Sequence, residues 1–431
     1  MTVTMRAADF IGTLGINTHI DFAAYGYQNL SVVESAINYL GLKNLRDSPE
    51  SAADVGSNGT WQQVATATGA KFDAYIPEGS PANMQASLNL VPQLASQSIL
   101  NAIEGGNEED DAYATSLGNT LQIAADFQKN DVWPLGQKLG LPVINMSFGA
   151  GWTASNGWIG DYASVGDLQQ YATYGNAHTY PAVGQNPDST IQRINGLARL
   201  ADSTDPVITT EIGWDRNQGY SQQTVAKFVL DATMDGIKDG DVKTYFYALF
   251  DDGAGKFGLM NQNGTPMAAG TALHNLTTLL ADKGVTASTF TTGSLSYSLS
   301  HTTANDNALL LQKSDGTYWL SLWNEVDAAH NVTVTLSSPA TEVKVFDPLS
   351  GTTATKDVKL ASSVSVRLTD HPLLFEVYPS STQSPPPPPP SPQPNDLVVN
   401  VPASGDTVTA NTTSSLPGRR SPIHGRRKVR D

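Results

Sequence analysis

Two glutamates, Glu108 and Glu211, each lie at or near the end of a short hydrophobic run. Glu108 closes Leu100–Glu108, and Glu211 lies near the end of Pro206–Trp214. When two carboxyl groups face one cleft, one can attack as a nucleophile while the other transfers a proton. This chemistry requires a fold that brings together two side chains far apart in the sequence.

Eight short runs rich in strand-forming residues indicate such a fold. They alternate with segments of helical spacing, and their starts fall about 30–40 residues apart, the length of one βα unit. The runs are Phe10–Ile20, Leu40–Ser48, Ala70–Glu78, Leu100–Glu108, Pro142–Gly149, Tyr174–Pro181, Pro206–Trp214 and Val242–Asp252. The clearest helical segments are Ser31–Leu40, Asn119–Leu139 and Ser221–Lys238.

The alternation predicts an α/β protein with a (β/α)8 TIM barrel over residues 1–285. Ser221 is a suitable N-cap for the last of these helical segments. A doubly wound open sheet is the alternative fold, but no glycine-rich phosphate loop follows the first run to support it.

In a parallel barrel, functional residues lie at the C-terminal ends of the strands. Glu108 closes the fourth run and Glu211 lies near the end of the seventh, and these two runs lie across the barrel mouth from each other. The polar residues at strand ends that are predicted to bind substrate are His19, Arg46, Asn107, His178, Tyr180, Tyr247 and Asp251. Hydrolysis of a glycoside with retention needs two carboxyl groups about 5–5.5 Å apart. Spacing and composition alone predict a barrel enzyme, and hydrolysis is one of the reactions that such an enzyme could catalyse.

Supporting residues have plausible tasks in this chemistry. Arg46 would hold Glu211 ionised through a charge-assisted hydrogen bond, and Tyr180 would donate to the same carboxylate. Asn107 would bond a sugar 2-hydroxyl. Taken singly, however, a strand-end glutamate is often solvated or salt-bridged, and Arg46 could be an ordinary ion-pair partner.

The two histidines at strand ends, His19 and His178, would contact sugar hydroxyls or the acid/base. The alternative for His178 and Tyr180 is that they are packing groups with polar tips. The combined placement of these residues at separate strand ends favours the functional interpretation.

Four short motifs resemble those of clan A glycoside hydrolases. Glu104–Glu109 (EGGNEE) resembles the Asn-Glu acid/base signature of strand four, and Thr210–Trp214 (TEIGW) resembles the nucleophile strand seven. Leu45–Asp47 (LRD) is similar to the strand-two arginine motif, and the segment 178–180 matches the His-x-Tyr of strand six. The resemblance spans about residues 8–285.

A barrel followed by a β-sandwich is similar to family 39, and to families 5, 30, 51 and 79. The resemblance implies retaining hydrolysis of β-glycosidic bonds, with Glu108 as general acid/base and Glu211 as nucleophile. We expect no cofactor and no metal, because the acidic residues Asp110, Asp111, Asp251 and Asp252 do not follow a calcium-loop spacing. This sequence has Gly105-Gly106 where many members carry an aromatic, and Tyr247 where a Trp is common. The resemblance therefore predicts the clan and the mechanism of this sequence better than it predicts a substrate.

Three tryptophans are candidates for stacking on sugar rings. Trp152 and Trp158 lie in the glycine-rich loop Gly149–Asp161, and Trp214 follows Glu211 by three positions. Each loop tryptophan could equally close the loop over the core. The favoured substrate is a β-linked polysaccharide such as a bacterial exopolysaccharide or a β-glucan, with internal or terminal cleavage left open.

After about residue 285 the pattern changes to alternating strand-like runs. Seven such runs, separated by turn residues, lie within residues 286–380, and together with a hairpin signal at Asp315-Gly316 they predict a small antiparallel β-sandwich. The runs are Ser294–Ser300, Ala308–Lys313, Tyr318–Trp323, Val332–Leu336, Glu342–Phe346, Val364–Leu368 and Leu373–Val377. Trp319 and Trp323 are expected in its core or against the barrel. Residues 381–394 are a proline-rich linker, and residues 395–431 are interpreted as a disordered tail or a truncated module.

The composition excludes several kinds of partner. Acidic residues outnumber basic ones by 41 to 25, a net charge of −16 that disfavours nucleic acid and anionic membranes. There are no cysteines, hence no thiolate metal site. Met1–Phe10 lacks the apolar run of a signal peptide, yet the proline-rich spacer and low charge density favour a secreted protein. We expect a monomer whose partner is carbohydrate.

Three alternative functions remain open. A transglycosylase would use the same two carboxylates, and a non-catalytic barrel would only bind carbohydrate. An aldolase would need a lysine at a strand end, whereas Lys43 and Lys71 lie near strand starts.

Overall fold

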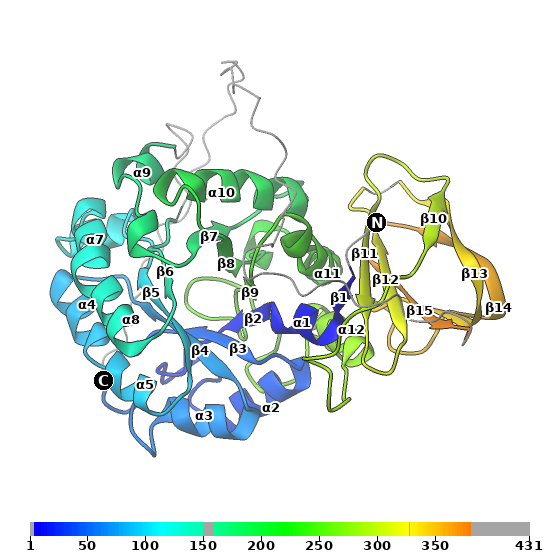
Figure 1. Ribbon diagram of the computed structural model, residues 1–431. Coiled ribbons are helices and arrows are strands. Elements are labelled where there is room, and N and C mark those ends of the chain that lie inside the picture. The colour runs from blue at the N-terminus through cyan, green and yellow to red at the C-terminus, as the bar shows by residue number, and fades with distance from the viewer. Residues whose placement is uncertain (1–3, 150–158, 327, 381–431) are drawn as a thin grey trace.

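The computed structural model describes residues 4–149, 159–326 and 328–380. Its larger part is a parallel eight-stranded sheet in the order β6-β5-β4-β3-β2-β9-β8-β7. A bridge between Ile144 and Tyr174 joins the two edges, which confirms the predicted barrel and excludes the open sheet (Figure 1). The strands are β2 (Leu14–Asn17), β3 (Asn44–Asp47), β4 (Lys71–Ile76), β5 (Leu100–Gly106), β6 (Val143–Ile144), β7 (Gly175–Thr179), β8 (Val207–Ile212) and β9 (Thr244–Phe246).

Each barrel strand lies within the run predicted for it. The first run differs at its start, because Phe10 belongs to helix α1 and the strand begins only at Leu14. Side chains alternate between the two faces of a strand. Inside the barrel they form an apolar layer of Ala102, Ile144, Ile208 and Tyr245. Polar residues occupy the next positions toward the C-terminal rim.

Helices surround the barrel (Figure 1). They are α1 (Ala7–Gly12), α2 (Leu30–Leu40), α3 (Thr60–Thr68), α4 (Pro81–Leu88), α5 (Val91–Ser96), α6 (Ala112–Ser116), α7 (Leu121–Phe127), α8 (Trp133–Leu139), α9 (Ile159–Ser164), α10 (Pro187–Ala201), α11 (Gln222–Lys238) and α12 (Ala268–Leu280). Ser221 caps α11 as predicted, since its Oγ accepts from the Thr224 backbone N–H at 3.0 Å. The predicted helix Asn119–Leu139 contains a π-helical turn between α7 and α8.

Within the described residues, no helix is long and apolar enough to cross a membrane.

The second sheet has the order β1-β11-β12-β15-β13-β10, with β14 paired to β13. Its strands are β1 (Met5–Arg6), β10 (Tyr297–Ser300), β11 (Asn307–Gln312), β12 (Tyr318–Trp323), β13 (His330–Phe346), β14 (Lys356–Leu368) and β15 (Leu373–Pro379). All pairings are antiparallel except that of β1, which joins from the N-terminus. The predicted hairpin connects β11 and β12.

Strand β13 merges two predicted strands, Val332–Leu336 and Glu342–Phe346. The residues between them, which include Pro339, were expected to form a turn, but they form an irregularity in one long strand. Its first half pairs with β10 and its second half with β15, so the sheet bends around its own apolar core.

The barrel and the second sheet share a buried interface. Trp319 and Trp323 are almost fully buried in the core that continues into the barrel helices, as predicted. The Trp323 indole N–H donates to Asp235 Oδ1 on α11 at 2.8 Å. Next to it on α11, Asp231 is fully buried, and neither carboxylate oxygen has a hydrogen-bond partner among the described residues.

Neutralising Asp231 is expected to stabilise the protein at high pH. Burial, followed by the charges of Asp235, Glu325 and Asp370, raises the pKa of Asp231 well above its ordinary value. The folded protein therefore holds a proton that the unfolded chain releases above pH ~3.9, so stability falls as pH rises. We expect Asp231→Asn to increase the free energy of unfolding at pH 8 by about 1–3 kcal/mol, with little change at pH 4. Thermal unfolding at both pH values measures this.

A gain of equal size at both pH values would contradict the charge argument, as would a loss at pH 8. Asp357→Asn is the matched control, because Asp357 is exposed on β14 and its neutralisation should change neither melting temperature.

Candidate active site

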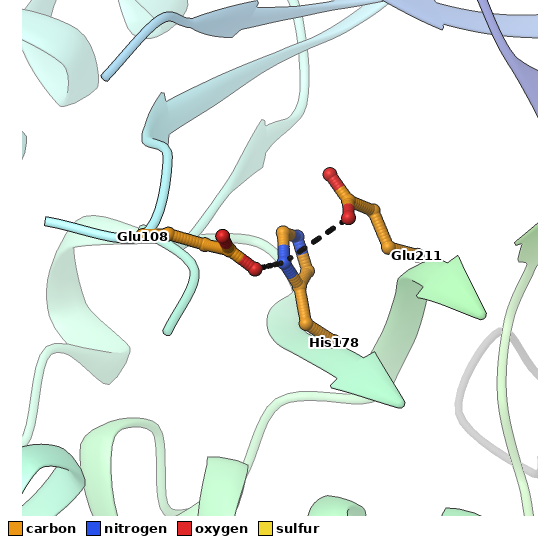
Figure 2. Close-up of side chains that lie close together, drawn as sticks. All are labelled: Glu108, His178 and Glu211. Atoms are coloured by element: carbon orange, nitrogen blue, oxygen red, sulfur yellow. Dashed lines mark hydrogen bonds and ion pairs between the residues drawn. The ribbon is translucent and has the colours of Figure 1, made fainter. Parts of the chain in front are cut away.

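Side chains from four barrel strands converge at the C-terminal rim. Figure 2 shows Glu108, which follows β5, pointing toward His178 of β7 and Glu211 of β8. One donor or acceptor atom from each of the three lies within 4.8 Å of the other two. Arg46 of β3 lies next to them, fully buried. The rim therefore brings together the residues predicted for catalysis.

Arg46 is the centre of a hydrogen-bond network. Its Nη1 donates to Glu211 Oε1 at 2.6 Å and to Asn17 Oδ1 at 2.9 Å. Its Nε and Nη2 both donate to Glu104 at 2.7 Å, in a bidentate pair. Nη2 also donates to Asn107 Oδ1 at 2.7 Å. One guanidinium thus orients both the proposed nucleophile and the asparagine beside the proposed acid/base.

Glu211 is held in its ionised form. Burial acts to raise its pKa, but His178, Arg46 and the hydroxyl of Tyr180, which donates to Oε2, outweigh burial and lower the pKa. A carboxylate that stays ionised near neutral pH can act as a nucleophile. The predicted roles of Arg46 and Tyr180 toward Glu211 match these contacts.

His178 connects the two carboxylates. Its Nδ1 lies 2.6 Å from Glu108 Oε1 and 3.6 Å from Glu211 Oε2. Its Nε2 lies 3.5 Å from Arg46 Nη2, whose two N–H groups already donate to Glu104 and Asn107. Burial acts to lower the pKa of His178, but Glu211 and Glu108 outweigh it and raise the pKa. A raised pKa favours the protonated ring, whose Nδ1–H donates to Glu108 Oε1.

Glu108 is the more accessible of the two carboxylates. Its side chain is 20% exposed, against 7% for Glu211. Its backbone has φ 48°, a left-handed conformation that is unusual for a residue other than glycine. Its N–H donates to Ser147 Oγ at 3.1 Å, which anchors the turn. This turn directs the Glu108 side chain toward His178.

A cleft opens over these residues. The residues that line it are Glu78, Asn107, Glu108, Asp111, Tyr113, Tyr180, Glu211, Tyr247, Ala254 and Phe257. Because the Asn107 oxygen accepts from Arg46, its amide nitrogen is the group available to a substrate hydroxyl. Tyr247 lines the cleft as predicted.

Solved structures share this fold, although no family model and no curated protein matches the sequence. A family 39 glycoside hydrolase from Bacteroides cellulosilyticus WH2 has a TM-score of 0.59 at 13% identity, over 88% of this chain and 83% of its own. A family 39 β-xylosidase from Caulobacter crescentus has a TM-score of 0.55 at 13% identity, covering 88% and 98%. Family 30 xylanase C from Talaromyces cellulolyticus has a TM-score of 0.53 at 14% identity, covering 88% and 98%. The chain has the fold of clan A glycoside hydrolases.

Four of the polar residues predicted to bind substrate do not line the cleft. Arg46 and His178 are buried beneath the two carboxylates and contact them instead of a ligand. His19 is buried, with Nε2 3.1 Å from the Tyr247 hydroxyl and 3.2 Å from Asp252 Oδ2. It therefore positions Tyr247 and does not reach a sugar. Asp251 instead pairs with Arg216 at 2.5 Å.

The predicted stacking tryptophans do not form a platform in the described residues. Trp214 is 2% exposed and packs against Phe228 of α11, so it presents no face to a ligand. Trp152 and Trp158 lie outside the described residues. The aromatic side chains that line the cleft beside Tyr180 and Tyr247 are Tyr113 and Phe257.

Four residues of the network were not among the predicted site residues. Asn17 and Glu104 accept from Arg46, Asn176 donates to Glu104, and Asp252 accepts from the Tyr247 hydroxyl at 2.9 Å. The sequence feature that could have identified them is a polar residue at an inward-facing position of a buried strand, because a buried charged group there needs a partner.

Glu108, His178 and Glu211 are also the one group of His, Asp or Glu in the described ranges whose spacing suits a metal ion. Arg46 already donates to Glu211 Oε1, and its positive charge would repel a metal cation bound at the same carboxylate. The absence of a metal and of a cofactor stays a prediction.

Replacing Tyr180 with phenylalanine is expected to raise the pKa of Glu211, because the hydroxyl hydrogen bond is one of the interactions that lower it. The titration can be followed by the carboxyl ¹³C signal of Glu211, assigned by its loss in Glu211→Gln. The expected change is about one pH unit. Tyr113→Phe is the control, because Tyr113 lines the same cleft but forms no hydrogen bond to Glu211. An unchanged titration in Tyr180→Phe would contradict the assignment.

Proposed function

We propose that the protein is a retaining glycoside hydrolase that cleaves β-glycosidic bonds by double displacement. The observation that supports this is the spacing of the two carboxylates, whose nearest oxygens lie within 4.8 Å. Retaining enzymes place their carboxyl groups about 5–5.5 Å apart, whereas inverting enzymes need about 6.5–9.5 Å to admit a water. The shared fold agrees with this proposal.

In the first step, ionised Glu211 attacks the anomeric carbon as the bond to the leaving oxygen breaks. Protonated Glu108 gives its proton to that oxygen, so the aglycone leaves as an alcohol. Arg46 and Tyr180 hold the Glu211 carboxylate in place through Oε1 and Oε2. The product is a glycosyl ester of Glu211.

In the second step, Glu108 accepts a proton from a water molecule that attacks the same carbon. The ester bond breaks, Glu211 leaves as the carboxylate, and Glu108 is protonated again. His178 hydrogen-bonds Glu108 in this exchange, because its Nδ1 lies 2.6 Å from Oε1. The sugar keeps its original anomeric configuration after two inversions.

The proposed substrate is a β-linked polysaccharide or oligosaccharide. Tyr113 and Phe257 offer aromatic faces to sugar rings. The cleft lining includes Glu78 and Asp111 besides the two reacting carboxylates, and no lysine or arginine is among the described lining residues. Negative potential in the cleft disfavours uronic acid or sulfated chains and favours neutral or cationic ones.

The test is reducing-end release from a panel of β-glycans and bacterial exopolysaccharides. We expect wild type to release ends and Glu211→Gln to be slower by about 10³-fold or more, because the nucleophile is lost. Glu108→Gln should lose about 10²–10⁴-fold. Glu34→Gln, half-exposed on α2, is the matched control and should keep full activity.

Release by Glu211→Gln at the wild-type rate would remove Glu211 from the mechanism. Proton NMR of the first product should show the β-anomer, and initial formation of the α-anomer would contradict retention. Products longer than the substrate would assign transglycosylation instead.

A further inference from the structure

Glu104 is a third carboxylate in the same network, one layer deeper in the barrel than the reacting pair. It is fully buried and does not line the cleft. Both of its oxygens accept from Arg46, Oε2 from Nε and Oε1 from Nη2, each at 2.7 Å. The substrate cannot reach Glu104, so any effect it has on the reaction passes through Arg46.

The bidentate pair fixes where the rest of the guanidinium points. A guanidinium is planar and rigid, so two bonds along one edge determine the direction of the remaining N–H groups. With Nε and Nη2 held by Glu104, Nη1 is directed at Glu211. The ring of Tyr75 lies 4.2 Å from the guanidinium carbon and covers its face. Arg46 therefore has little freedom to reorient.

Glu104 is itself anchored to the strand that carries the nucleophile. Asn176 of β7 donates from Nδ2 to Glu104 Oε1 at 2.8 Å. The Asn176 oxygen accepts from the Thr210 hydroxyl at 2.5 Å, and Thr210 immediately precedes Glu211 on β8. A closed chain of buried hydrogen bonds thus runs from β8 through β7, β5 and β3 back to β8.

In this hydrogen-bond network, a single guanidinium is paired with two carboxylates, Glu104 and Glu211. Glu104 accepts from two of the guanidinium N–H groups, and Glu211 accepts from one. In a buried environment each neighbouring charge affects the others strongly. If Glu104 were neutral, the full charge of Arg46 would act on Glu211 alone and make it a weaker base and a weaker nucleophile.

We propose that Glu104 is a positioning residue that sets the basicity of Glu211 by sharing the charge of Arg46 and fixing its direction. The proposal rests on the proposed function, in which Glu211 attacks the anomeric carbon. Arg46 then aligns the nucleophile without suppressing its reactivity. The charge of Glu104 and the position of its oxygens both contribute.

The direct test is the titration of Glu211, followed by its carboxyl ¹³C signal in labelled protein. It is made in the Tyr180→Phe background, where the titration moves to higher pH and is easier to reach. Adding Glu104→Gln keeps the shape and removes the charge, so the pKa of Glu211 is expected to fall by about one unit. An unchanged or higher pKa would overturn the proposal.

Glu104→Asp keeps the charge but withdraws it from Arg46 by one bond length. It should lower the pKa of Glu211 in the same direction by a smaller amount, and it carries the test if the Gln variant does not fold. Failure of both variants to fold would assign Glu104 to stability alone and overturn the proposal. Asp231→Asn is the matched control, because it removes a buried acid that neither lines the cleft nor forms a hydrogen bond to Arg46, and it should leave the titration unchanged.

Kinetics give an independent readout on a glycan that wild type cleaves. We expect Glu104→Gln to lower kcat about 10-fold and to change KM less than about twofold, because Glu104 does not contact substrate. A rise in KM with unchanged kcat would contradict the role. The titration needs no substrate, so failure of the proposed hydrolysis and failure of this proposal are distinguishable.

Discussion

The site depends on one buried cation, the guanidinium of Arg46. A buried charge is tolerated only when it is paired and fully hydrogen-bonded. Arg46 meets this condition through Glu104, Glu211, Asn17 and Asn107, which are contributed by different barrel strands or the residues that follow them. The network therefore forms only when the barrel closes, so the fold and the reactive geometry have the same physical requirement.

The two carboxylates that we propose to react differ because their surroundings differ. Glu211 is buried against Arg46 and Tyr180, which favour its anion, whereas Glu108 is more exposed and has His178 as its recorded side-chain partner. In the proposed mechanism, this difference assigns the roles of nucleophile and proton donor to chemically identical side chains. The arrangement of side chains at the rim, and not the residue types alone, would determine which glutamate takes each role.

The sequence predicted the barrel, the second sheet and the close approach of Glu108 and Glu211, because strand period and strand-end position are local properties. It did not predict which of Asp251 and Asp252 turns toward Tyr247, since adjacent residues after a strand differ only in how the chain bends there. Trp214 was placed at the cleft, but it packs against a helix instead. Glu104 was missed because its role depends on an arginine two strands away.

The central claim is that Glu211 forms a covalent bond to the sugar. The most direct measurement is intact mass followed by peptide mapping after incubation with 2-deoxy-2-fluoro-β-glycosyl fluorides, which slow the second step of double displacement more than the first. The account predicts a mass increase of one fluorosugar, located on the peptide that contains Glu211. A label on another residue, or turnover to the inverted product with no label, would contradict it.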